Sequence, residues 1–312
     1  MAYSQPTHLS LKTLSFNIYT IWLFTYSDLK TIVGPKTAFG ILGGLRAHVF
    51  GLPCEAPYLV IRRLPLVAFW TWINLLPFSI DNQRQAQAIQ EDQVNKPWRP
   101  LPSHRLTSRQ ATYLMLGVYP FSVLSSIYLG GLRQCLLLIF LGIWYNDGAG
   151  ADCHPLVRNF INAFGFLAYT SGAMEVACGA CISLALGSPL SRWLGVIGLI
   201  VISTVHTQDM FDQAGDSLRN RWTVPLAIGD WPSRVSIAIL LAFWSWLGPF
   251  IWGLNAMGFL VPMSLGITIS MRTLTMRSVE DDKRTFLLWN LWIVTLYSLP
   301  FFATGWRKYT WS

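Results

Sequence analysis

Long apolar stretches alternate with short polar ones along almost the whole chain. Each apolar stretch is rich in Leu, Ile, Phe and Trp and approaches the roughly 20 residues that a helix needs to cross a bilayer. Nine stretches have this character, at about residues 29–48, 64–83, 109–129, 131–146, 157–176, 190–208, 234–253, 255–273 and 286–304. An open sheet would leave unpaired backbone groups in lipid, so the pattern predicts helices. We expect an all-α integral membrane protein, a bundle of about nine transmembrane helices around a central cavity.

The segment before the first apolar stretch differs from the rest. Residues 12–27 are predicted to form an amphipathic helix that lies at the membrane interface. We therefore divide the chain into an N-terminal interfacial segment, residues 1–28, and a transmembrane domain, residues 29–312. The first residues lack a short apolar core closed by a small-residue cleavage site, so no signal peptide is expected.

The composition agrees with a protein that sits in lipid. Only 12% of the 312 residues are charged, whereas soluble domains contain about 25%. The net charge is +8, and no soluble basic domain exists to carry it, so it points to anionic lipid head groups and an anionic substrate rather than nucleic acid. Two of the five cysteines, Cys178 and Cys181, form a C-x-x-C in an apolar run, where packing is a better expectation than metal or redox chemistry.

The basic residues are unevenly divided between the two sides of the predicted bundle. The loops after even-numbered spans, together with Arg158 beside one of them, hold 13 Lys and Arg residues. The other loops and the C-terminal tail hold seven, including Arg307 and Lys308. By the positive-inside rule the richer side is cytosolic. We expect a multi-pass protein of the endoplasmic reticulum whose active site faces the cytosol.

Three acids end the sixth apolar stretch, in the run Asp209-Met-Phe-Asp212-Gln-Ala-Gly-Asp216. On one continuous helix, offsets of three and seven residues fall within about 60°, so the three carboxylates are predicted to form one stripe. Such carboxylates repel one another unless a cation lies between them, and Mg²⁺ prefers oxygen ligands of this kind together with phosphate oxygens. The alternative is a solvated helix end that the following Arg219 and Arg221 neutralise.

A second group of charged residues lies in the loop after the second apolar stretch. It reads Glu91-Asp92-Gln-Val-Asn-Lys96-Pro-Trp-Arg99-Pro-Leu-Pro-Ser, with Arg105 shortly after. Three prolines restrict the loop to few conformations. Fixed cations beside acids suit a diphosphate, which Arg binds as a fork and Lys as a point charge. The alternative is a basic loop that sets topology and touches lipid.

Both motifs resemble signatures of the UbiA superfamily, membrane enzymes that ionise prenyl diphosphates with magnesium. The acid run followed by Thr223-Val-Pro225-Leu resembles the second signature, and N-K-P-W-R-P-L-P-S resembles the end of the first. The resemblance implies a catalytic domain over residues 29–312, a prenyl diphosphate substrate and Mg²⁺ as cofactor. It implies these site residues: Asn82, Glu91, Asp92, Asp209, Asp212 and Asp216 for the metal; Lys96, Arg99, Arg105, Arg219 and Arg221 for the diphosphate; and, among them, Lys96, Arg99, Asp92 and Asp212 for catalysis.

The first signature departs from the family pattern N-D-x-x-D-x-x-x-D. Ala88 stands where the family has its middle Asp, and Asn82 lies two residues too early. On a straight helix Asn82 would point about 180° away from Glu91, so either the helix breaks near residues 84–90 or Asn82 is not a ligand. Asn82-Gln83, Glu91-Asp92, Asn146-Asp147 and Arg158-Asn159 look like a fungal branch of the superfamily that includes membrane-bound terpene cyclases.

The resemblance leaves more than one function open. In a terpene cyclase the allylic cation is attacked by double bonds of its own chain, whereas in a prenyltransferase an acceptor captures it. We favour the cyclase because of the altered first signature. A transporter or scaffold on the same bundle is a third alternative, against which the retained acid run argues. The chain length of the substrate, farnesyl or geranylgeranyl, and the oligomeric state stay open.

Several other residues allow two interpretations. His206 is either a base in the cavity or a packing residue, and Glu175 is either functional or placed at the far interface. Trp70, Trp72 and Trp144 either line the cavity and stabilise carbocations or pack between helices.

Overall fold

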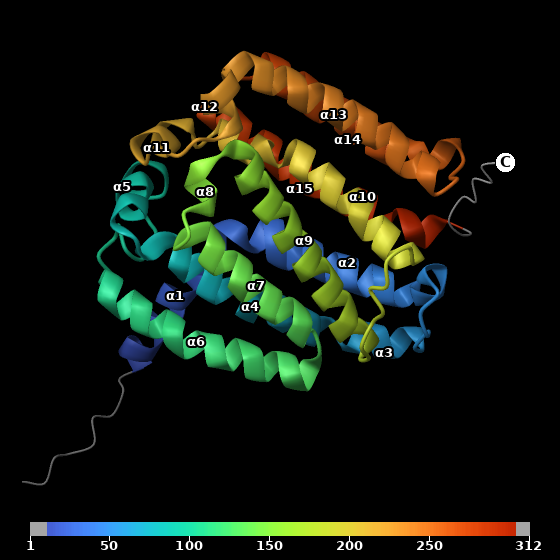
Figure 1. The fold of residues 1–312 in the computed structure, drawn as a ribbon, viewed down its shortest axis with the longest axis horizontal. Coiled ribbons are helices and arrows are strands. Elements are labelled where there is room, and N and C mark those ends of the chain that lie inside the picture. Colours follow the sequence, from blue (N-terminus) through green and yellow to red (C-terminus); the bar gives the residue numbers. More distant parts are fainter. Residues whose placement is uncertain (1–10, 304–312) are drawn as a thin grey trace, which may run out of the picture.

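The long helices of residues 11–303, the part of the chain that the computed structural model describes, slant side by side across the view in Figure 1. They are α1 (Leu11–Thr25), α2 (Gly34–Leu45), α4 (Leu64–Arg84), α6 (Ser108–Leu129), α7 (Leu132–Asn146), α9 (Pro155–Cys178), α10 (Pro189–Thr204), α13 (Asp230–Ile251), α14 (Ala256–Thr275) and α15 (Val279–Phe302). No strand occurs within residues 11–303, so the predicted all-α class is confirmed. Residues 1–10 of the predicted interfacial segment, residue 304 of the ninth span, Arg307 and Lys308 lie outside the described residues.

Short helical pieces connect the long ones. They are η1 (Tyr26–Asp28), a π-helical turn η2 (Leu29–Val33), η3 (Ala47–Phe50), α3 (Pro57–Arg62), α5 (Ala86–Asn95), α8 (Gly150–Cys153), η4 (Val205–Met210), α11 (Gln213–Leu218) and α12 (Val224–Ile228). Figure 1 shows α5, α8, α11 and α12 gathered at one end of the bundle and α3 at the opposite end. The basic loops 82–109, 147–155 and 209–234 thus lie at a common end.

Six helices within residues 11–303 are long and apolar enough to cross a membrane, so the predicted count of nine is not confirmed. They are Leu64–Arg84, Ser108–Leu129, Pro189–Met210, Asp230–Ile251, Ala256–Thr275 and Val279–Phe302. The predicted span 29–48 is divided among η2, α2 and η3, and α7 has only 15 residues. These six helices make the chain a multi-pass membrane protein.

Helix α9 is long enough to span but carries too many polar side chains to count among the six. Arg158, Asn159 and Glu175 are all buried within it. The reason is its position, because α9 packs against α2, α4, α7 and α10 rather than facing outward. A helix enclosed by protein on most sides can keep polar groups that lipid would exclude.

Polar side chains fix the starts of several helices. Thr107 accepts from the backbone of Gln110 at 3.2 Å, and the Gln110 side chain accepts from the Thr107 backbone at 2.9 Å. Ser188 and Ser278 cap α10 and α15 in the same way, by accepting from backbone N–H groups three residues on. Such caps satisfy N–H groups that have no partner inside the helix.

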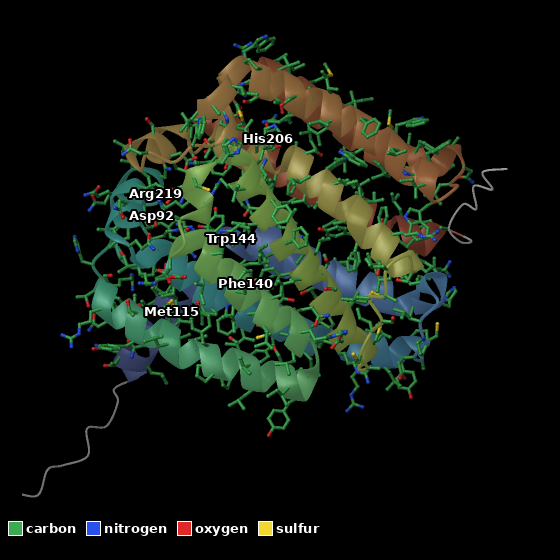
Figure 2. All side chains as sticks on the ribbon, in the orientation of Figure 1. Asp92, Met115, Phe140, Trp144, His206 and Arg219 are labelled. Carbon is green, nitrogen blue, oxygen red and sulfur yellow. The ribbon has the colours of Figure 1, made fainter. Side chains whose placement is uncertain are left out.

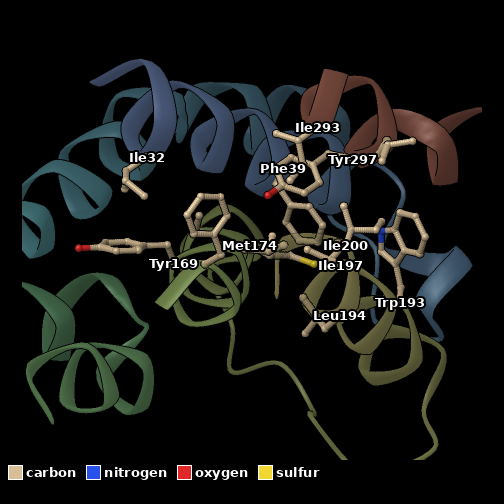
Figure 3. Packing of buried hydrophobic residues seen from close by; sticks show 14 of the residues in the cluster. Ile32, Phe39, Tyr169, Met174, Trp193, Leu194, Ile197, Ile200, Ile293 and Tyr297 are labelled. Atoms are coloured by element: carbon tan, nitrogen blue, oxygen red, sulfur yellow. The ribbon is translucent and has the colours of Figure 1, made fainter. Parts of the chain in front are cut away.

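The core is dominated by aromatic and branched side chains from α2, α9, α10 and α15. Figure 3 shows part of it, where the rings of Phe39 and Tyr297 meet edge to face at 5.2 Å between centroids. Trp70 of α4 is fully buried and donates a hydrogen bond to Ser126 of α6 at 2.9 Å. Its ring lies against Gly172 of α9, where a Cβ atom would come within 2.0 Å of the indole.

We predict that Gly172→Ala destabilises the protein by about 1–3 kcal/mol, because the fixed indole of Trp70 cannot make room without strain. Thermal unfolding of purified protein in detergent would measure this. Gly195→Ala is the matched control, since a Cβ there meets nothing within 4 Å. Equal melting temperatures for the two variants would contradict the close packing of Trp70 of α4 on Gly172 of α9.

Candidate active site

A cavity of about 560 Å³ opens at the end of the bundle where α5 and α11 meet. Its volume lies within the roughly 300–1,000 Å³ typical of small-molecule sites. One part of its wall is apolar and aromatic, and consists of Ile32, Leu75, Phe78, Leu138, Leu141, Tyr145, Ile161, Phe166, Tyr169 and Phe211. Tyr26, Ser27 and Asp28, which the predicted division places in the N-terminal segment, also line it.

The charged part of the wall is mainly positive. Its cations are Lys30, Lys96, Arg99, Arg158, Arg221 and Lys283, and its carboxylates are Asp28, Glu91 and Asp212. Six positive against three negative groups in a partly enclosed cleft create a field that attracts an anion.

The helix that carries the first motif breaks at Gln85. Helix α4 ends at Arg84, Gln85 has an extended backbone with φ −77° and ψ 148°, and α5 begins at the next residue. The Arg84 side chain fixes the break by pairing with Asp81 at 2.7 Å and Asp147 at 2.5 Å. Of the two alternatives from the sequence, the broken helix is the one found.

The break brings Asn82 of α4 and Glu91 of α5 onto the wall of the same cavity. A straight helix would have pointed them in opposite directions. Ala88, at the position of the missing family Asp, is buried in α5.

The second motif does not form the predicted single stripe, so that expectation is wrong. Asp209 lies in the 3₁₀ turn η4, Asp212 follows in an irregular turn, and Asp216 lies in the separate helix α11. The 3₁₀ turn ends at Met210 and the next α-helix begins at Gln213. The directions of the three carboxylates therefore cannot be read from their spacing on one α-helix.

Gly215 of the second motif allows α11 to approach α5. A Cβ at this position would lie 2.2 Å from the Asn95 amide nitrogen and 2.9 Å from Cγ of Glu91. The glycine therefore lets the two motifs touch, and residues of both motifs line the same cavity, as expected of a shared site.

Each acid of the two motifs is paired with a basic side chain. The pairs are Asp209–Arg158 at 2.8 Å, Asp212–Lys96 at 3.3 Å, Asp216–Arg221 at 3.1 Å, Glu91–Arg219 at 3.5 Å and Asp92–Arg99 at 2.9 Å. Asp152 of α8 joins the group by pairing with Arg219 at 3.3 Å and Arg221 at 3.0 Å. Figure 2 labels Asp92 and Arg219, which lie near each other at this end of the molecule.

These pairs act on the acidity of the carboxyl groups. Burial opposes ionisation of Glu91, but the charges of Arg221, Lys96 and Arg219 outweigh it and hold its pKa below the usual value. Burial raises the pKa of Asp216 to about 7, with Arg158 opposing the shift and the charge of Asp209 adding to it. Asp216 is therefore a carboxyl group that a nearby cation would help to ionise.

The donor atoms fit magnesium in their chemistry. Among the predicted metal ligands, three buried oxygens accept no hydrogen bond, namely Oδ1 of Asn82, Oδ2 of Asp209 and Oδ2 of Asp216. Oxygens of carboxylates and amides are the ligands that hard divalent cations take. However, no three His, Cys, Asp or Glu side chains of residues 11–303 converge closely enough to hold one ion. A cation that bridged these acids would have to draw them away from their basic partners.

The UbiA prenyltransferase family matches residues 80–292, about two thirds of the chain. This chain belongs to that family. The match includes both motifs, so the resemblance inferred from the sequence is confirmed.

Similarity to individual UbiA-family proteins extends beyond the matched region. Fumagillin beta-trans-bergamotene synthase of Aspergillus fumigatus is 28% identical over 94% of this chain and 96% of its own length. Somaliensene A/B synthase of Streptomyces somaliensis is 27% identical over 90% and 91%. A polyprenyl transferase of Hericium erinaceus is 27% identical over 70% and 71%.

Solved structures share the fold. A digeranylgeranylglyceryl phosphate synthase superimposes with a TM-score of 0.56 at 18% identity, over 91% of this chain and 98% of its own. A UbiA homolog from Archaeoglobus fulgidus bound to GPP and Mg²⁺ gives 0.56 at 12% identity, over 90% and 99%.

The predicted site residues of this UbiA-family chain fall into three groups. Asn82, Glu91, Lys96, Arg99, Asp212 and Arg221 line the cavity. Asp92, Asp209, Asp216 and Arg219 are buried behind them, each paired with a charged neighbour. Arg105 is in neither group, because its guanidinium stacks on Phe16 and Tyr19 of α1. Its assignment to the site is therefore corrected.

The residues whose roles the sequence left undecided make contacts within the protein and do not line the cavity. His206 is buried, and its Nε2 lies 3.0 Å from the Ser236 hydroxyl, away from the cavity lining. Glu175 lies near the C-terminus of α9, where it pairs with Arg133 at 2.8 Å and accepts from the Gly131 N–H at 3.0 Å. Cys178 is buried and Cys181 exposed, both as free thiols.

The tryptophans proposed for the cavity do not line it. Trp70 packs between α4 and α9, Trp72 donates to Thr25 at 3.1 Å, and Trp144 contacts Phe160. Among residues 11–303, Trp98 is the tryptophan that reaches the cavity. Phe and Tyr side chains supply the remaining aromatic surface.

Several basic side chains that line the cavity were not among the predicted site residues. Arg158 was counted among the basic residues of the predicted cytosolic side and noted within a resemblance, but it was not assigned to the site, although an arginine at the start of an apolar span is itself a signal for a polar cavity. In the structure it also donates to the Tyr145 hydroxyl. Lys30 and Lys283 come from segments that are distant in sequence, and nothing in the sequence indicated that these lysines meet.

Arg234 of α13 supports the second motif from behind. It forms two parallel bonds of 2.8 Å to Asp282 of α15 and one of 2.9 Å to Asp230. Asp230 in turn accepts from Gln213, which follows Asp212, at 3.1 Å. Asp282 precedes Lys283, so this connection runs between two cavity residues, Asp212 and Lys283.

We predict that Arg234→Met destabilises the protein by about 3–5 kcal/mol, because Asp282 would stay buried without its partner. The melting temperature in detergent should fall sharply. Arg284→Met is the control, since Arg284 pairs with Glu280 at 3.3 Å on an exposed surface. A similar small loss in both variants would show that the Arg234 network does not hold the site together.

Proposed function

We propose that this chain ionises a prenyl diphosphate with the help of magnesium and cyclises the resulting allylic cation to a cyclic terpene. The observation that carries the proposal is the composition of the cavity wall, which combines six basic side chains and three carboxylates with an apolar, aromatic surface. A prenyl diphosphate combines the matching groups, an anionic head and an unsaturated hydrocarbon chain.

We assign the diphosphate to Lys96, Arg99 and Arg221, with Arg219 holding Glu91 behind them. Charged donors that point to the leaving group stabilise the negative charge that develops as the C–O bond breaks. Arg158, which was not foreseen, also reaches the cavity and adds a further charged donor.

The proposed metal ligands are Asn82, Glu91, Asp92, Asp209, Asp212 and Asp216. Magnesium, when bound, would neutralise charge on the diphosphate and so favour its departure. The unpartnered oxygens of Asn82, Asp209 and Asp216 support this assignment, as does the Archaeoglobus homolog bound to GPP and Mg²⁺.

The aromatic wall suits the second half of the reaction. Phe78, Phe166, Tyr169 and Phe211 present rings to the cavity, and π faces attract cations. Apolar neighbours such as Leu138 limit access of water, which would otherwise capture the cation as an alcohol.

Cyclisation is favoured over transfer to an acceptor for two reasons. The first signature lacks the family Asp at Ala88, and the two relatives named as terpene synthases cover at least 90% of this chain. The similarity to a polyprenyl transferase over 70% of the chain makes prenyl transfer the second candidate.

We propose that the protein lies in the membrane of the endoplasmic reticulum and that its cavity opens toward the cytosol. The orientation rests on the uneven distribution of basic residues, with 13 on the side of the motifs and seven on the other.

The deciding experiment omits any acceptor. Purified protein, Mg²⁺ and either farnesyl or geranylgeranyl diphosphate should yield diphosphate and a cyclic hydrocarbon. Asp209→Asn should lower diphosphate release by about 100-fold or more, whereas Glu280→Gln, on the exposed end of α15, should not. If product forms only after a phenol or another acceptor is added, the protein is a prenyltransferase.

The cavity also predicts how substrate length can be altered. Gly165 of α9 lines it, and a Cβ at this position meets nothing within 4 Å. We predict that Gly165→Phe fills this space and shifts kcat/KM toward shorter prenyl diphosphates by about tenfold or more. Gly195→Phe, whose Cβ also meets nothing within 4 Å but which does not line the cavity, is the control. An unchanged preference in Gly165→Phe would place the prenyl chain elsewhere.

A further inference from the structure

A second hollow lies outside the main cavity, between α1 and the loop that follows α5. Lys12, Ser15, Phe16 and Tyr19 of α1 line it together with Arg105. The reaction proposed above does not use these residues. Two cations in one hollow of a protein with few charges call for a separate explanation.

Arg105 is held by aromatic rings instead of carboxylates. Its guanidinium carbon lies over the rings of Phe16 and Tyr19, 5.0 Å and 4.9 Å from their centroids. No carboxylate within the described part of the chain forms an ion pair with it. Stacking uses the faces of the guanidinium and leaves its in-plane N–H donors available for an anion.

The surroundings of the hollow have the composition of a membrane–water interface. Phe16, Tyr19, Trp22 and Tyr26 are 38–50% exposed. The rings of Tyr19, Trp22 and Tyr26 form a row, with centroids 5.7 Å apart from Tyr19 to Trp22 and 4.5 Å from Trp22 to Tyr26. Trp98 continues the row at 5.3 Å. Exposed aromatic rings beside basic side chains are typical of the level of lipid head groups.

We propose that this hollow binds the head-group phosphate of an anionic phospholipid. Arg105 supplies a fork of donors to the phosphate oxygens and Lys12 a second positive charge. The exposed rings of α1 lie against the glycerol and upper acyl region. Because Tyr26 and Trp98 also line the main cavity, a lipid held here fixes α1 beside the wall of that cavity. This inference does not depend on which reaction the cavity catalyses.

The experiment measures lipid retention without turnover. Purified protein in a neutral detergent is titrated with dioctanoyl phosphatidate or dioctanoyl phosphatidylcholine, and bound lipid is counted by native mass spectrometry. We expect the wild type to retain phosphatidate in preference to phosphatidylcholine. Arg105→Gln and Lys12→Gln should each weaken phosphatidate binding by about fivefold, the effect of one basic residue near an anionic head group.

Two comparisons make the test specific. Arg109→Gln removes the same charge from a guanidinium that also stacks on a ring, Tyr113 at 5.5 Å, but lies outside the hollow, so it should bind as the wild type does. Phe16→Leu with Tyr19→Leu keeps the charge but removes the rings that orient Arg105, and should also weaken binding. If Arg105→Gln does not fold, the affinity of Lys12→Gln for phosphatidate, compared with that of the wild type, tests the proposal.

Three results would overturn the proposal. Equal retention of phosphatidate by wild type, Arg105→Gln and Lys12→Gln would show that the hollow does not bind it. Equal retention of the two lipids would mean that no anionic head group is recognised. Displacement of phosphatidate by inorganic diphosphate at equal concentration would identify a site for soluble anions instead.

Discussion

The pairing of buried carboxylates with buried basic groups is the constraint on which the open end of this bundle depends. Asp92, Asp209 and Asp216 are at most 1% exposed, and each would be strongly destabilising without its arginine. The partners come from different elements, since Arg158 belongs to α9 and Asp209 to η4. The network therefore determines where the short helices lie, and with them the shape of the cavity opening. The hydrophobic core supports the long helices but cannot by itself place α5 against α11.

The same network controls the chemistry that the site can perform. Arginines on the cavity wall are held in position by acids behind them, so a ligand meets preorganised donors. The acids, in turn, have few free oxygens, and a metal ion must compete with guanidinium groups for them. Binding of an anionic substrate and binding of a cation are thus linked, because an arginine that turns toward a diphosphate releases the carboxylate that it had neutralised. This end of the molecule therefore provides paired charges that can exchange partners, and not a preformed set of metal ligands.

The all-α class, both motifs and the family could be predicted from the sequence. These features are local properties, since they depend on apolar length and on the spacing of charged residues. The predictions were wrong where the backbone leaves regular geometry. The stripe of Asp209, Asp212 and Asp216 assumed one helix, but the chain turns at Asp212. The break at Gln85 could be stated only as one of two alternatives, because the contact of Arg84 with Asp147 joins segments that are 63 residues apart. Arg105 was misplaced because its sequence neighbours are site residues, whereas its spatial neighbours belong to α1.

The enclosed position of α9 has a consequence for how the protein is made. This helix carries Arg158, Asn159 and Glu175, and it is too polar to be stable alone in lipid. Earlier elements, α2, α4 and α7, cover part of its surface, but Asp209, the partner of Arg158, is synthesised some 50 residues later. Until η4 is made, Arg158 therefore lacks the carboxylate that neutralises it in the folded protein, and α9 carries an uncompensated buried charge.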